Sequence, residues 1–167
     1  HVHITLQHLG LSVDQAMLFE RLASRVFGLD ASCISPADLA RNTLGQPHLW
    51  GHGISGDLPI IVVCVPEVAT MALVRQLLQA QEYWRLKGLR ADLVILNEHP
   101  AEYRDETQEF LTALLEEPRW AGWNNQPGGM FLLRAEGMSD ADRHLLSAVA
   151  RVVLPGMTYW WDKEGGR

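Results

Sequence analysis

A glycine-rich stretch that runs straight into an apolar segment most constrains the fold of this chain. Residues 51–59 contain three glycines, and the run at 60–65 that follows holds three valines and two isoleucines. A continuous apolar run rich in β-branched residues is typical of a strand buried on both faces. Such strands occur almost only in parallel sheets that helices cover, so the run indicates an α/β domain.

Strand and helix patterns alternate along the rest of the chain. Apolar runs at 93–96, 130–133 and 152–154 predict three further strands. Three strand–helix–strand crossovers predict a three-layer αβα domain around a Rossmann-like parallel sheet of about four strands. We expect the spatial strand order 2-1-3-4. The intervening helices are predicted to start at Pro66–Glu67, at Pro100 and after the cap Ser139. The first is expected to end at Gly88, and its inward residues are Met71, Val74, Leu77, Leu78 and Trp84. The inward residues of the second are Tyr103, Phe110, Leu111, Leu114 and Leu115.

Extra helices are expected before the first strand. The apolar positions of residues 1–7 alternate loosely, and Ser12 with Gln15 then predicts a capping box. The helix that follows places Ala16, Phe19, Leu22, Ala23 and Val26 on one stripe, and Ser35–Pro36 to Gly45 predicts a shorter helix. We expect one domain of a larger multidomain enzyme: a helical part at 1–48, the α/β core at 49–156 and a tail at 157–167 toward the next module.

Composition excludes several partner classes. The 167 residues carry a net charge of −6, which argues against nucleic acid and against an anionic membrane surface. No apolar run approaches the ~20 residues of a membrane-spanning helix, so no direct membrane contact is expected. The two cysteines make no disulfide framework, and Cys64 inside the first strand is expected to be a small buried hydrophobe.

The spacing Gly51-x-Gly53-x-x-Gly56 matches the dinucleotide fingerprint in letters but not in position. A pyrophosphate site needs the glycines after a strand and at a helix N-terminus, whereas here they precede the strand. We therefore interpret Gly51, Gly53, Gly56 and Asp57 as a structural loop with positive φ angles. The turns after the strands carry acids and only one cation, Arg134, so neither a phosphate nor a nucleotide cofactor is expected; the acids are Glu67, Glu98, Glu102, Glu136 and Asp140.

Glu98 is the one candidate catalytic residue. It follows the second strand, where a catalytic acid or base of this fold class would lie, and Glu67 or Asp57 would be its partner carboxylate. The same acids are the oxygen ligands that Mg²⁺ prefers. We favour the simpler interpretation of a solvated acid at a helix start. The seven histidines show no metal-ligand spacing, and Ser55 precedes a strand where a nucleophile elbow would follow one, so neither a metal site nor a hydrolase triad is expected.

The six tryptophans fall into two groups. Trp50 and Trp84 are expected in the core. The other four lie in a loop at 118–129 or in the tail, among polar residues and glycines, and they are Trp120, Trp123, Trp160 and Trp161. Exposed aromatic rings stack on sugars or are covered by another domain, and we favour the contact between domains.

Four segments carry a family resemblance: HLGL at 8–11, LWGHGISGDLPI at 49–60, EYWRLKGL at 82–89 and ADLVILNE at 91–98. Together they resemble cyclic β-1,2-glucan synthase, a very large bacterial inner-membrane enzyme in which a glycosyltransferase, a cyclising glycosidase-like module and a family 94 phosphorylase-like module share one polypeptide. The resemblance places this chain between the later modules, near the phosphorylase-like part.

The resemblance implies a parent enzyme in glucan biosynthesis but no reaction for this piece. The chain contains neither the glycosyltransferase's metal-binding aspartate motif nor a match to the phosphorylase's catalytic aspartate. The resemblance therefore implies a non-catalytic accessory domain without a cofactor, on the cytoplasmic side of the membrane, with the flanking domains as partners. A β-1,2-glucan-binding module that uses the four loop and tail tryptophans is one alternative, and a catalytic or Mg²⁺-dependent site around Glu98 is the other.

Overall fold

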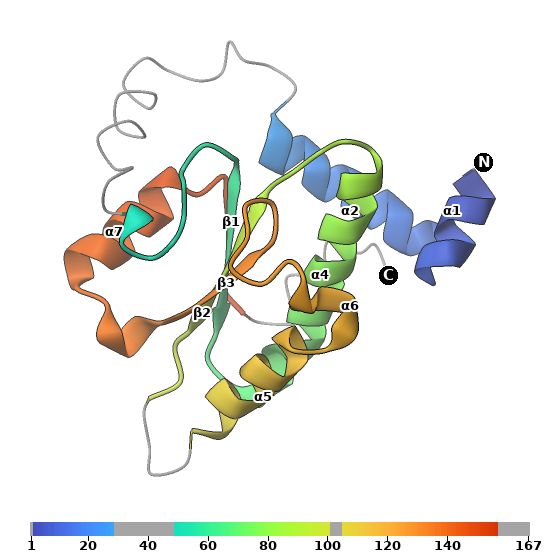
Figure 1. Cartoon of the computed structure of the whole chain (residues 1–167). Helices are drawn as coiled ribbons and strands as arrows, with labels where there is room; N and C mark the ends of the chain where they lie inside the picture. The colour runs from blue at the N-terminus through green and yellow to red at the C-terminus, as the bar shows by residue number, and fades with distance from the viewer. Residues whose placement is uncertain (1, 29–48, 101–104, 157–167) are drawn as a thin grey trace.

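The computed structural model describes residues 2–28, 49–100 and 105–156 (Figure 1). A four-stranded, all-parallel sheet forms the middle layer, with β1 at Ile60–Val65, β2 at Asp92–Asn97, β3 at Met130–Arg134 and β4 at Val152–Leu154. Helices cover both faces. The predicted three-layer α/β class is therefore confirmed.

The strands lie in the order β3-β2-β1-β4, so the predicted order 2-1-3-4 is wrong. After β2 the chain does not turn back across β1 but places β3 on the outer side of β2. Two hydrogen bonds join the start of β2 to the residues just before β3: Leu93 N donates to the Gly129 oxygen at 3.0 Å, and Gly128 N donates to the Asp92 carboxylate at 2.7 Å. The chain reverses only after β3, and β4 then pairs with the free edge of β1.

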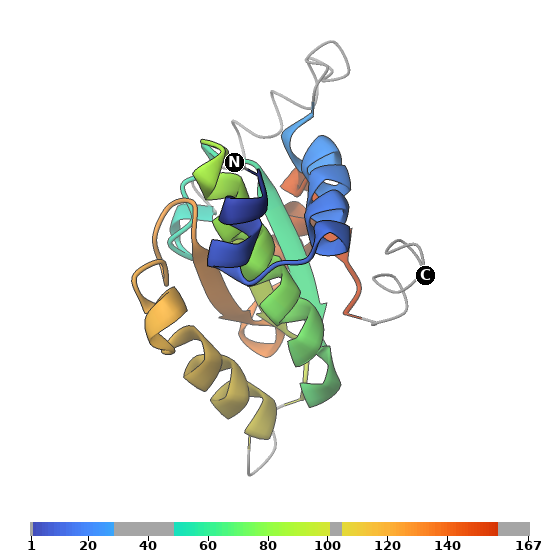
Figure 2. The ribbon, with the colours of Figure 1, turned by 90° about the vertical axis from the view of Figure 1, so that its right-hand side faces the viewer.

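Five helices share one face of the sheet: α1 (Val2–Leu9), α2 (Val13–Phe27), α4 (Met71–Leu86), α5 (Glu106–Leu115) and α6 (Pro118–Ala121). Figure 2 shows α4 lying along the sheet, with α1 packed on its outer side and α2 alongside it. The other face is covered by α7 (Asp140–Val149) and by the segment 49–59 (Figure 1). No helix in these described ranges combines the length and the apolar character needed to cross a bilayer.

The predicted start and face of α2 are confirmed. Ser12 Oγ accepts from Gln15 N at 3.1 Å, and Gln15 Oε1 accepts from Ser12 N at 2.9 Å, which completes the capping box. The predicted inward stripe is buried at Ala16, Phe19, Leu22 and Val26 and half-buried at Ala23. The loosely alternating N-terminal segment forms the helix α1, and the helix predicted at Ser35–Pro36 to Gly45 lies outside the described residues.

The helix predicted from Pro66–Glu67 begins as a short 3-10 turn, η2 (Val68–Thr70), before α4 starts at Met71. Its predicted inward residues are buried except Met71, which is half-buried. Trp84 anchors this layer: it is 1% exposed, its indole donates to the Phe19 oxygen at 3.0 Å, and its ring meets Phe27 edge-on at 5.3 Å. Gly88 has φ 78° just beyond the helix, as a helix-terminating glycine does.

The core face of α5 differs from the prediction. Leu111, Leu114 and Leu115 are buried as expected, but Phe110 is 46% exposed while Thr107 is buried. Asp105 caps the helix through Gln108 N at 3.1 Å, and Tyr103 lies outside the described residues. The buried stripe runs through Thr107, Leu111, Leu114 and Leu115, and Phe110 lies on its flank because successive residues are rotated by about 100° around a helix. The predicted loop at 118–129 begins with the short helix α6.

The last crossover agrees with the prediction. Ser139 caps α7 by accepting from Asp142 N at 3.1 Å, after the short 3-10 turn η3 (Ala135–Gly137). The helix returns the chain to β4 at the sheet edge.

Candidate functional site

The polar side chains beyond the carboxyl ends of the strands are the candidate functional site, because open α/β sheets bind ligands there. Glu98 follows β2 directly, and its backbone N donates to the Val65 oxygen at 2.9 Å, so the end of β1 fixes its position. Arg143, one turn into α7, reaches across and donates to Glu98 Oε2 at 2.9 Å. The candidate catalytic carboxylate is therefore held in an ion pair.

This ion pair corrects the expectation that Arg134 is the only cation at the strand ends. Arg143 was missed because its position on α7 gives no sign, in the sequence, that it faces β2. Two facts taken together could have indicated its position. The helix α7 follows the third strand and must return past the strand ends, and Arg143 lies in the first turns of that helix. The depression beside it, about 310 Å³ in volume, is lined by Asp140, Arg143, His144 and Ser147.

Cys64, the last-but-one residue of β1, lies beside this pair. Its side chain is half-buried, and burial first and the Glu98 carboxylate second raise the pKa of its thiol to about 11. The nucleophilic form of cysteine is the thiolate, which is scarce at neutral pH with such a pKa. The expectation of a small buried residue is confirmed in part, and the geometry does not activate Cys64 as a nucleophile.

Arg134 and Asn97, at the ends of β3 and β2, also have protein partners. Arg134 at the end of β3 lies 2.5 Å from Asp105 and 4.0 Å from Glu136. Asn97, 2% exposed, donates to Gln108 at 2.8 Å and accepts from His99 N at 3.0 Å. Every one of these polar groups has a protein partner, which leaves few of them to bind a ligand.

The crevice between β1 and β4 is closed by direct contact. In the order β3-β2-β1-β4 the winding direction changes between these two strands, which is where a ligand crevice would open. Thr70 Oγ1 donates to the Gly156 oxygen at 2.8 Å in a buried contact. Gly156 has φ 75°, and a Cβ added there would lie 1.8 Å from the Cys64 oxygen. Backbone and a threonine side chain therefore fill the space.

The other acids predicted at the strand ends have different surroundings from Glu98. Glu67 and Asp140 are exposed, Glu136 is near Arg134, and Glu102 lies outside the described residues. Among the described residues, no group of three or more His, Cys, Asp or Glu side chains has the arrangement to hold a metal ion. The structure brings Cys64, Glu98 and Arg143 together, and it gives Glu98 a cation rather than a second carboxylate.

The glycine segment before β1 packs on the α7 face of the sheet. Gly53 and Gly56 have φ 82° and 80°, which confirms the predicted positive φ at these two positions but not at Gly51. Ile54 is fully buried, and a Cβ on Gly53 would already lie 4.0 Å from the Phe131 ring. Asp57 N donates to Ser55 Oγ at 3.2 Å within the turn. The segment is a packed cover for the sheet and presents no helix N-terminus to an anion.

The tryptophans are distributed differently from the prediction. Trp84 is in the core as expected, but Trp50 is 59% exposed, with its indole donating to the Ser55 oxygen at 2.9 Å. Trp120 is 3% exposed because α6 turns it into the core, so it offers no face to a sugar or to another domain. Trp123 is half-buried beneath the guanidinium of Arg85, 4.2 Å from the ring centre. Trp160 and Trp161 lie outside the described residues.

A second polar cluster, which sequence reasoning missed, lies at the amino end of β2. Asp92 is fully buried, accepts from Gly128 N at 2.7 Å, and has its pKa raised above the ordinary range by burial and, less strongly, by Asp57. Gln81, 2% exposed, donates to the Gly129 oxygen at 2.6 Å and to the Ala91 oxygen at 3.0 Å. These contacts fasten the 122–129 loop to the sheet, which is a structural role.

Fold and site together define the class: a three-layer α/β domain in which Glu98, Arg134 and Asn97 at the strand ends each have a protein partner. No family model matches the chain. It is similar to a segment of the cyclic beta-(1,2)-glucan synthase NdvB of Rhizobium meliloti (strain 1021), 29% identical over 157 residues. This match spans 93% of the chain but 5% of that protein's length, so the likeness is at the level of one domain, and it confirms the resemblance found in the four sequence segments.

Proposed function

We propose that this chain is a non-catalytic accessory domain of a cyclic β-1,2-glucan synthase, which holds flanking modules of the same polypeptide in register during glucan synthesis. The proposal includes a place on the cytoplasmic side of the bacterial inner membrane, as part of a membrane-anchored enzyme. The observation that carries it is the similarity of 93% of the chain to one short segment of such a synthase.

The state of the strand ends supports the non-catalytic part of the proposal. A general acid or base needs a pKa tuned to its task and a side chain free to reach a substrate. Glu98 is held instead by Arg143 at 2.9 Å, and the neighbouring thiol is protonated at neutral pH. The crevice at the change of winding direction is filled by the Thr70–Gly156 contact.

The substitution Glu98→Gln in the full-length synthase tests the proposal. We expect the rate of β-1,2-glucan formation in membranes to remain within about twofold of the unaltered enzyme, since loss of a part-exposed ion pair costs at most ~1 kcal/mol of domain stability. A catalytic acid or base replaced by its amide would lower the rate by roughly 10²–10⁴-fold. A loss of that size, at unchanged protein level, would make Glu98 catalytic.

The glucan-binding alternative has its own measurement. Linear β-1,2-glucan is titrated into the chain to millimolar concentration while tryptophan fluorescence is followed, with Trp123→Phe as the matched control. We expect no saturable change. A saturable change that disappears in Trp123→Phe would assign the half-buried ring to sugar stacking and contradict a purely structural role.

A further inference from the structure

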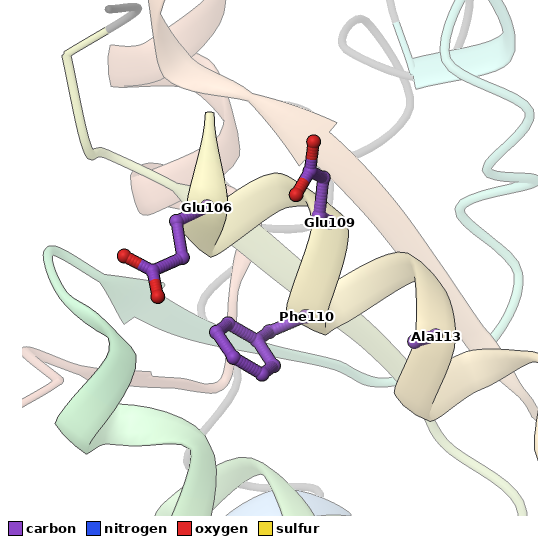
Figure 3. A pocket seen from close by; sticks show the side chains of 4 residues that line it. All are labelled: Glu106, Glu109, Phe110 and Ala113. Carbon is purple, nitrogen blue, oxygen red and sulfur yellow. The ribbon is translucent and has the colours of Figure 1, made fainter. Parts of the chain in front are cut away.

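The outer side of α5 carries an exposed aromatic ring in a depression. Phe110 is 46% exposed, and the depression of about 440 Å³ is lined, among the described residues, by Glu106, Glu109, Phe110 and Ala113, which we call the α5 surface. Figure 3 shows the Phe110 ring and the Glu106 carboxylate extending from the same side of the helix, with Glu109 further round it. An apolar ring next to carboxylates in a hollow has the composition of a contact surface.

The carboxylates of the α5 surface are not in ion pairs with any described residue, unlike several acids elsewhere in the domain. Six acids elsewhere among the described residues lie in ion pairs with an arginine or lysine: Glu20, Glu82, Glu98, Asp105, Glu117 and Glu136. No cation among the described residues lies within ion-pair distance of Glu106 or Glu109. The helix dipole favours acids in the first turn of α5, but it gives no reason for an exposed phenylalanine beside them.

We infer that the α5 surface binds another part of the parent polypeptide, a segment that presents an apolar side chain flanked by lysine or arginine. The apolar group fits beside Phe110, and the cations pair with Glu106 and Glu109. This inference rests on the proposed function, because the matched segment makes up 5% of its relative's length and the flanking modules supply the remainder.

The modest size of the α5 surface fits a tethered partner better than a free one. A free protein partner needs roughly 800 Å² of surface on each side for stable binding. A segment of the same polypeptide has an effective concentration of about millimolar order, so a contact centred on one ring and two charges is sufficient.

Site-specific photo-crosslinking in the full-length synthase tests this inference. A benzophenone amino acid replaces Phe110 in one variant and Thr112, which is exposed on the same helix but does not line the depression, in the matched control. Both positions are at the surface, so neither variant disturbs the core. We expect the label at 110, and not at 112, to crosslink to one lysine- or arginine-containing segment outside these 167 residues.

Charge substitutions then separate a specific contact from chance proximity. The double variant Glu106→Gln, Glu109→Gln should lower the crosslink yield at 110 about threefold, as expected for losing two partly exposed charge contacts. Glu116→Gln, an exposed acid at the end of the same helix, should leave the yield unchanged.

Four outcomes would overturn the inference: a crosslink within this domain, a crosslink to a second copy or to another protein, a yield at 110 no higher than at 112, or a yield indifferent to the double variant. These results are independent of the Glu98→Gln measurement. An active Glu98→Gln enzyme without the crosslink would leave the accessory role standing and remove only the α5 surface from it.

Discussion

At the scale of single residues, the environment of each side chain decides its chemistry. Cys64, Glu98 and Arg143 are residue types that serve as nucleophile, base and anion binder in many enzymes. Here the arginine is paired with the glutamate, and the glutamate and burial together keep the thiol protonated. The three groups lie together where β1, β2 and α7 meet, and the ion pair and the raised thiol pKa are what the structure shows of their chemistry.

Cys64 alkylation measures this environment directly. In a Cys33→Ser background, which leaves Cys64 as the one thiol, we expect the iodoacetamide rate to rise about tenfold per pH unit from pH 7 to 10 without a plateau, because the thiol pKa is raised to about 11. Glu98→Gln should shift the profile to lower pH, since the carboxylate contributes to the raised value. In denaturant the midpoint should return to about 8.5. A plateau below pH 9 in the folded chain would contradict this account.

At the scale of secondary structure elements, close backbone contact joins β1, η2 and the end of β4. The carbonyl of Cys64 leaves no room for a side chain at Gly156, and Thr70 binds the Gly156 oxygen on the other side. Gly88 provides a matched comparison, because its φ of 78° is similar to the 75° of Gly156 but nothing lies within 4 Å of a Cβ added there.

Alanine substitutions at these two glycines separate steric overlap from backbone strain. Gly88→Ala should lower the free energy of unfolding by about 1 kcal/mol, the cost of a left-handed conformation. Gly156→Ala should lower it by about 3 kcal/mol or more, because β1 and β4 must also move apart. Urea denaturation followed by circular dichroism gives both values. Equal losses of unfolding free energy would show that the backbone around Gly156 moves to accept the added Cβ at no further cost.

Local signals explain which elements could be predicted from the sequence. The buried strands, the Ser12 and Ser139 caps and the Gly88 stop each depend on neighbouring residues, so they are visible as short patterns. Phe110 was misplaced because its apolar side chain was counted into the stripe of Leu111, Leu114 and Leu115, whereas the buried position that completes this stripe is the polar Thr107. Strand order was missed because the bonds that set it, such as Gly128 to Asp92, join residues 36 positions apart.

At the scale of the whole molecule, the predictable part of the fold depends on local patterns and chain order, whereas the site depends on contacts between segments far apart in the sequence. The glycine segment was recognised as structural because its position relative to β1 is a matter of chain order. The ion pair of Glu98 with Arg143 depends on which face α7 covers, and the burial of Trp120 depends on the α6 turn; neither follows from local composition. The contacts between side chains at the candidate site are therefore known only from the three-dimensional structure.

Global stability against pH gives a whole-molecule test of the amino-end cluster. Burial raises the pKa of Asp92 in the folded state, so between the unfolded value of about 3.9 and the folded value the native chain holds a proton that the unfolded chain has released. Raising the pH through this window must therefore remove stability. The many other carboxylates titrate over the same range, so the effect of Asp92 has to be measured as a difference.

Asp92→Asn supplies that difference, because the amide oxygen keeps the acceptor for Gly128 N but does not titrate. We expect the free energy of unfolding of the unaltered chain, minus that of Asp92→Asn, to be constant below pH about 3.5 and to fall as the pH rises from about 4 toward neutrality. Asp14→Asn, at an exposed position in the first turn of α2, is the matched control and should show no such fall. A difference that stays constant from pH 4 to 7 would mean that folding leaves the pKa of Asp92 unchanged and would contradict the expected effect of burial. A difference that rises would mean that folding stabilises the charged carboxylate, and the 122–129 loop would then be held by a charged rather than a neutral hydrogen bond.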